Sequence, residues 1–112
     1  MFEEMRWLEY SQRLQRHRRG VYPSLARYEG MNELAPMLMN CATIYGASHL
    51  GVDTGKIETG KWADFAALDL RAAVLRDVHD RHLLGAMILG GSAEGLVTDT
   101  CMAGKWTRRV FA

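Results

Sequence analysis

The stretch GKIETGKWADFAALD (Gly55–Asp69) decides how this chain is organised. Two glycines, Gly55 and Gly60, stand where the backbone is expected to reverse, because glycine accepts positive φ without a Cβ clash. An apolar run at 65–68 follows, closed at each end by an aspartate. Such a run is typical of a buried strand, although periodicity alone also allows a helical turn. The stretch therefore predicts a turn, a short extended segment, a second turn and a strand.

The N-terminal residues 1–19 are predicted to form a helix. Trp7, Tyr10 and Leu14 fall at i, i+3 and i+7, which places them on one face. Glutamates lie near the start and arginines near the end, an order that suits the helix dipole. Gly20 is expected to follow the end of this helix, and residues 21–31 are interpreted as a linker.

A second helix is predicted over residues 33–50, ending before Gly51. Its proline, Pro36, is expected in the first turn, where a missing N–H is tolerated, so the helix start could shift to Ala35. The apolar face of this helix recurs at i, i+4, i+7 and i+11, at Leu34, Leu38, Cys41 and Tyr45.

The remaining chain predicts mostly strands. Residues 71–81 are polar and interpreted as irregular, and 82–89 as a short helix. Strands are predicted at about 64–70, 96–102 and 105–111, the last two joined through Ala103-Gly104 as a hairpin. We therefore expect an α+β fold: two N-terminal helices followed by a small antiparallel sheet. Residues 1–51 and 52–112 would be the helical and sheet-forming parts of one structural unit.

Composition excludes several classes of function. The chain has 112 residues and a net charge of +1, which gives no general case for binding nucleic acid or an anionic membrane. The basic run Arg16–Arg19 is interpreted as a solvated helix end rather than a phosphate-binding patch. No apolar run approaches transmembrane length, and the N-terminus lacks the features of a signal peptide. Cys41 and Cys101 lie far apart, as expected of reduced thiols in a cytosolic protein, with a disulfide as the alternative.

The opening stretch resembles a segment of the amidohydrolase superfamily. In that family the pattern G-x-I-x-x-G-x-x-A-D, closed by a further aspartate, follows the last helix of a metal-binding (β/α)8 barrel. The chain there returns to a small β-sandwich. The resemblance is carried by Gly55, Ile57, Gly60, Ala63, Asp64 and Asp69.

A second segment, Met5–Leu14, resembles a helix of N-formimino-L-glutamate deiminases, which use a bound metal to hydrolyse a formimino group. Ser11 stands where that family has glycine. The run 41–51 is similar to the family's final barrel helix, and 82–107 to its terminal helix and hairpin. The resemblance implies that this chain corresponds to the last barrel helices and part of a composite β-sandwich.

The chemistry of the family is not encoded in this sequence. The family binds its metal through an H-x-H pair, two later histidines and an aspartate, and no H-x-H occurs here. His79 and His82 stand at i and i+3 beside Asp77 and Asp80, and on a helix they would form half of a zinc site. The alternative is that they are surface residues of a polar loop. Ser48 and His49 are neighbours in sequence, which does not build a nucleophile–base pair. We therefore assign no catalytic, cofactor-binding or metal-binding residue, and expect zinc only in the full-length family.

Three hypotheses follow. The first is an inactive C-terminal fragment of a metal-dependent amidohydrolase. The second is a stand-alone, oligomeric binding or interaction module, and the third is a small hydrolase that uses His79 and His82. A homodimer is expected, because a fragment would expose the face of Trp7, Tyr10 and Leu14 together with an open sheet edge.

Overall fold

The computed structural model describes residues 1–19, 31–91 and 95–108. Its elements follow the predicted order, with the long helices first, then a strand, short helical segments and two further strands. They are α1 (Phe2–Arg16), α2 (Met31–Asn40), η1 (Cys41–Tyr45), α3 (Gly46–Leu50), β1 (Phe65–Leu68), η2 (Ala73–Leu75), η3 (Asp80–His82), α4 (Leu83–Leu89), β2 (Val97–Met102) and β3 (Lys105–Arg108). The α+β class is confirmed. The linker predicted at 21–31 lies outside the described residues except for Met31, and so does the end of the third strand after Arg108.

Helix α1 ends earlier than predicted and buries a different face. It ends at Arg16 rather than at residue 19, and the residue that follows, His17, takes the left-handed conformation with φ of 52°. Trp7 and Leu14 are exposed by 60% and 74%. The buried residues are Phe2, Met5 and Glu9. The Glu9 carboxylate accepts a hydrogen bond from Arg13 Nε at 2.6 Å, which offsets the cost of removing a charge from water.

The second helix is a continuous run of α2, η1 and α3, from Met31 to Leu50. Pro36 therefore lies inside the helix, not in its first turn, and is exposed. The helix lacks the hydrogen bond that an N–H at this position would donate. The segment η1 is a π-helix, whose wider turn departs from the 3.6-residue period. Leu34 and Leu38, which precede this segment, are buried as predicted, whereas Tyr45 at its end is 54% exposed.

The three strands form one antiparallel sheet in the order β1-β2-β3. Phe65 pairs with Cys101, which pairs with Trp106 on the other side. A bulge between Ala67 and Leu68 shifts the register at the end of β1. The hairpin turn predicted at Ala103-Gly104 is present, with positive φ at both residues. Within the described chain, β1 and β3 each leave one edge unpaired.

The core brings together α1, α2, α4 and the segments on either side of α4. Leu75, interpreted from sequence as part of a polar irregular stretch, is 3% exposed and packs in this core. Ile88 of α4 and Leu96, just before β2, are fully buried. The buried residues of the cluster are Phe2, Met5, Leu34, Ala35, Leu38, Leu75, Ile88 and Leu96. The core thus draws residues from both the 1–51 and the 52–112 segments.

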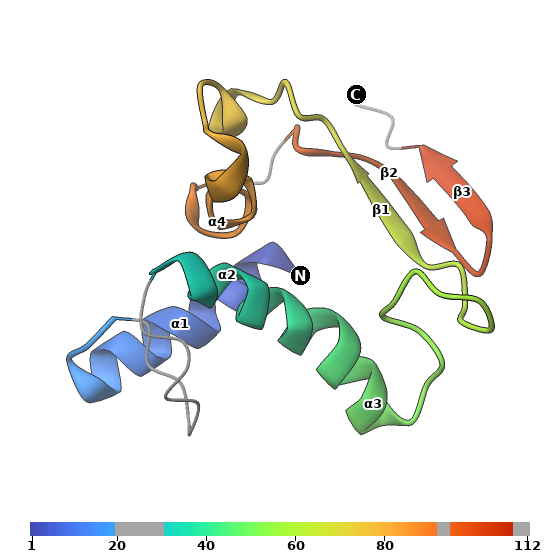
Figure 1. Ribbon diagram of the computed structural model, residues 1–112, viewed down its shortest axis with the longest axis horizontal. Coiled ribbons are helices and arrows are strands. Elements are labelled where there is room, and N and C mark those ends of the chain that lie inside the picture. The colour runs from blue at the N-terminus through green and yellow to red at the C-terminus, as the bar shows by residue number, and fades with distance from the viewer. Residues whose placement is uncertain (20–30, 92–94, 109–112) are drawn as a thin grey trace.

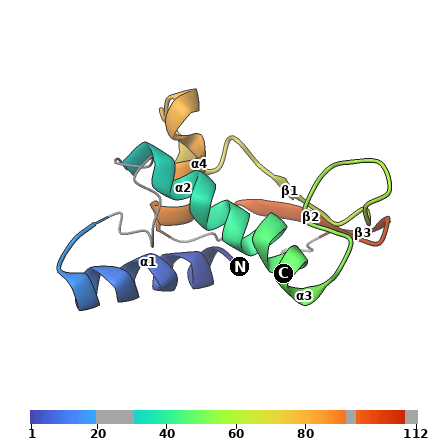
Figure 2. The ribbon, with the colours of Figure 1, turned by 60° about the horizontal axis from the view of Figure 1, so that its bottom comes forward.

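The sheet stands to one side of the helices in both views (Figures 1 and 2). In these views α1 and α2 lie next to α4, while the hairpin of β2 and β3 projects away from them. The Cα radius of gyration is 15.2 Å, against roughly 13 Å expected for a compact domain of this length. No helix of the described chain is long and apolar enough to cross a membrane.

Candidate functional site

The stretch Gly55–Asp69 is fixed to the second helix through Gly55. Its φ is +87°, and an added Cβ would lie 2.6 Å from the backbone oxygen of Thr43 in η1. Gly55 is therefore glycine for two reasons, its backbone conformation and its close approach to the π-helix. Gly60 has a similar φ of +89° but open space around the missing Cβ. Both turns predicted from sequence are present.

Asp64 locks this stretch to the β2–β3 hairpin. One carboxylate oxygen accepts a hydrogen bond from the backbone N–H of Ala103 at 2.8 Å. The other accepts from the Thr54 hydroxyl at 2.7 Å. These two bonds, the Ala103 N–H first, hold the pKa of Asp64 below its ordinary value. The Asp64 carboxylate is thus engaged in holding two turns together.

Asp69 at the end of this stretch and Asp53 just before it are also engaged within the fold. Asp69 accepts from the backbone N–H of Arg71 at 2.9 Å and from its guanidinium Nε at 3.3 Å. These bonds hold the pKa of Asp69 below its ordinary value. Asp53 pairs with Lys61 at 3.1 Å. The stretch that resembles the amidohydrolases therefore builds a connection between helix and sheet.

The histidines do not converge on one point. His17 ends α1, and His49, like Ser48 beside it, is exposed on α3. His79 and His82 lie with ring centroids 6.5 Å apart, edge to face. His82 Nε2 accepts a hydrogen bond from Arg81 Nε at 3.1 Å, and the His79 Nδ1 faces the Arg81 backbone N–H at 3.4 Å.

The described ranges contain no group of three or more His, Cys, Asp or Glu side chains that could hold a metal ion. The two thiols are free, Cys101 being buried and Cys41 half-buried. The residues that the structure describes therefore do not fit a zinc centre. Asp77 and Asp80, beside the histidine pair in sequence, add no such group.

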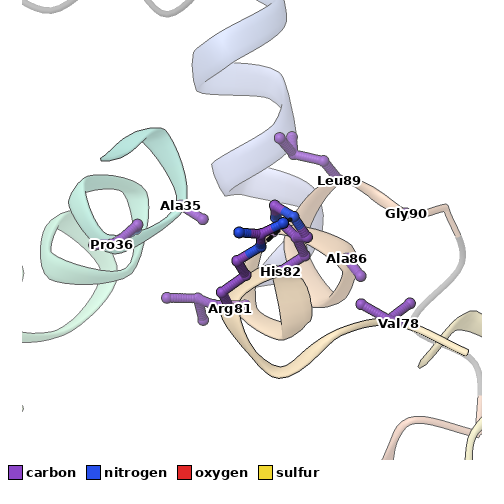
Figure 3. A pocket seen from close by; sticks show the side chains of 10 residues that line it. Ala35, Pro36, Val78, Arg81, His82, Ala86, Leu89 and Gly90 are labelled. Carbon is purple, nitrogen blue, oxygen red and sulfur yellow. Dashed lines mark hydrogen bonds between the residues drawn. The ribbon is translucent and has the colours of Figure 1, made fainter. Parts of the chain in front are cut away.

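A cleft of about 450 Å³ lies between α2 and α4 (Figure 3). Ala35 and Pro36 line it from α2, and Leu84 and Leu89 from α4. Arg81 and His82 supply its polar groups, and their side chains lie against one another in the close-up. The cleft was not predicted from the sequence, since its walls come from segments about 40 residues apart. The only local indication of it is that Arg81 lies between His79 and His82 in sequence.

A model of the amidohydrolase family matches residues 1–107, and the chain belongs to this family. Formimidoylglutamate deiminase of Pseudomonas aeruginosa is 33% identical over 108 residues, which cover 96% of this chain and 22% of that protein. The 5-methylthioadenosine/S-adenosylhomocysteine deaminases of Natronomonas pharaonis and Haloarcula marismortui are each 48% identical over 46 residues, 41% of this chain and 11% of theirs. The chain thus spans about a fifth or less of these relatives.

Proposed function

We propose that this chain is the terminal scaffold segment of a hydrolase that cleaves C–N bonds, of the formimidoylglutamate deiminase kind, and that it is inactive by itself. The observation that carries the assignment is the extent of the match. The likeness to formimidoylglutamate deiminase runs over 96% of the chain, whereas the likeness to the two nucleoside deaminases covers 41%. All three relatives are named as enzymes that remove nitrogen from carbon.

In this proposal the helix from Met31 to Leu50 corresponds to the last helix of the barrel. The sheet is part of the composite β-sandwich to which the chain returns. The contact of Gly55 with Thr43 and the hydrogen bonds of Asp64 support this role, because they fix the angle between helix and sheet. The proposed inactivity is supported by the sequence, which lacks H-x-H, and by the separation of its histidines. A metal-activated water needs ligands that hold the ion and lower the pKa of the water.

The experiment is an ammonia-release assay with purified chain, N-formimino-L-glutamate and added Zn²⁺. We expect no release above a protein-free control with the same metal. Metal-dependent release that His79→Ala abolishes would overturn the proposed inactivity and support the third hypothesis. His17→Ala serves as the matched control, because His17 lies at the end of α1 and belongs to no cluster.

A second candidate function is a self-associating interaction module, which we propose as a homodimer formed through α1. Trp7, Tyr10 and Leu14 share the face of α1 away from the core and are exposed. Covering a few hundred Å² of such surface contributes up to ~10 kcal/mol before the loss of association entropy is subtracted. A two-fold arrangement is the commonest closed solution.

Sedimentation equilibrium tests the dimer. We expect a mass twice that of the 12.6 kDa chain at micromolar concentration. The double variant W7E/L14E is expected to sediment as a monomer, whereas Ile57→Glu, at a side chain 88% exposed on the turn stretch, is expected to leave the dimer intact. A 12.6 kDa species at all concentrations would refute the dimer.

We also propose a cytosolic location, which the two free thiols support.

A further inference from the structure

The cleft between α2 and α4 combines an apolar interior with Arg81, a cation that has no acidic partner among the described residues. Its volume of about 450 Å³ lies within the range of roughly 300–1,000 Å³ found for small-molecule sites. Ala35, Pro36, Leu84 and Leu89 form its apolar walls. An apolar wall of this kind favours a ligand with a compact hydrocarbon or aromatic body.

Arg81 supplies the charge at this cleft. Its guanidinium donates through Nε to the ring nitrogen Nε2 of His82 at 3.1 Å. No carboxylate lies within ion-pair distance of Arg81 in the described ranges, in contrast to Arg13, Arg71 and Arg108. The bond to His82 occupies one donor and fixes the plane of the guanidinium. The remaining N–H donors form the planar fork that binds a carboxylate in bidentate fashion.

We propose that this cleft binds a small organic carboxylate with an apolar body, its carboxylate on Arg81 and its body between α2 and α4. Charge complementarity selects an anion over a neutral or cationic molecule. His82 acts as a positioning residue for Arg81. The apolar walls distinguish the ligand from inorganic anions, which would bring no surface to bury there. The proposed binding does not depend on the hydrolase assignment.

The probe is phenylacetate, titrated into the ¹⁵N-labelled chain and followed by amide chemical shifts. We expect saturable shifts that map to Ala35, Leu84 and their neighbours. Phenylacetamide has the same shape without the charge, and it is expected to bind at least about tenfold more weakly because the hydrogen bond between charged groups is lost. Inorganic phosphate is expected to bind at least about tenfold more weakly because it makes no apolar contact.

Two variants test the residues. Arg81→Gln is expected to weaken phenylacetate binding at least about tenfold. Arg76→Gln removes an exposed arginine that does not line the cleft and is expected to bind like the unmodified chain. Gly85→Leu places a side chain in the space next to Ala35, whose Cβ lies 4.0 Å from a Cβ added at Gly85. This variant is expected to abolish binding while the far-ultraviolet circular dichroism stays unchanged.

Several outcomes would overturn the proposal. They are an absence of saturable shifts, shifts confined to the sheet, equal affinity for acid and amide, or equal weakening by Arg81→Gln and Arg76→Gln. Should Gly85→Leu fail to fold, the two surface arginine variants and the amide still decide, since neither arginine belongs to the core cluster.

Discussion

Replacing Gly55 by alanine tests whether the stretch Gly55–Asp69 is fixed to the π-helix η1. The added Cβ would lie 2.6 Å from the Thr43 oxygen, 2.7 Å from its carbonyl carbon and 3.1 Å from the nitrogen of Ile44. All three are backbone atoms of η1, so no flexible side chain can move aside. Gly60→Ala is a matched control, because φ is almost the same, +89° against +87°, and no atom lies within 4 Å of its added Cβ.

The two variants share every contribution except the contact. Each places an alanine at positive φ, which costs roughly 1–2 kcal/mol, and each reduces the entropy of the unfolded chain, which offsets ~0.4–1 kcal/mol of that. Overpacking against a rigid neighbour costs a further ~1–3 kcal/mol, and this applies to Gly55→Ala alone. We therefore expect Gly55→Ala to destabilise the chain by about 1–3 kcal/mol more than Gly60→Ala does.

Urea unfolding, followed by tryptophan fluorescence and circular dichroism, measures this difference. With a slope of roughly 1–3 kcal/mol per M, the two midpoints should differ by on the order of 1 M. Equal midpoints would refute the reasoning, since they would mean that the stretch does not rest on η1 in solution. A change of slope in Gly55→Ala alone would indicate that the helix and sheet unfold separately.

Three further predictions concern the hairpin and the core. Asp64 has a lowered pKa when folded. Its contribution to stability is therefore present above the unfolded pKa of about 3.9 and is lost as pH falls through the lower folded value. A carboxyl titration by NMR with a midpoint at or above about 3.9 would contradict this. Asp64→Asn should accelerate hydrogen exchange of the Ala103 amide, which donates to that carboxylate, while Asp53→Asn should not. Leu38→Ala, at a side chain 1% exposed, should cost about 2–5 kcal/mol, whereas Leu50→Ala, 75% exposed, should stay within about 0.5 kcal/mol in urea unfolding.

The turns and the strands could be predicted from sequence because their signals are local. Gly55 and Gly60 mark positive φ, and Ala103-Gly104 between two strand-like runs marks a hairpin. Buried Leu34 and Leu38 follow from helical periodicity in the same way. Features of this kind depend on a few neighbouring residues, so a single sequence is enough to find them.

The features that sequence analysis missed depend on contacts between distant segments. The face with Trp7 and Leu14 has the same periodicity as the face with Phe2 and Met5, and only packing decides which one is buried. The exposure of Tyr45 follows from the π-helix, whose register no local pattern announced. The cleft at Arg81 exists only because α4 approaches α2.

The row of paired residues across the sheet has a consequence for the reactivity of Cys101. Phe65, Cys101 and Trp106 are partners in register and therefore share one face. The two rings stack with centroids 6.3 Å apart, and the thiol, 3% exposed, donates to the Ala63 oxygen at 3.3 Å. An alkylating reagent can reach this sulfur only when the hairpin opens, whereas the half-buried Cys41 is more accessible. The alkylation rate of Cys101 relative to that of Cys41 thus reports how often the sheet opens.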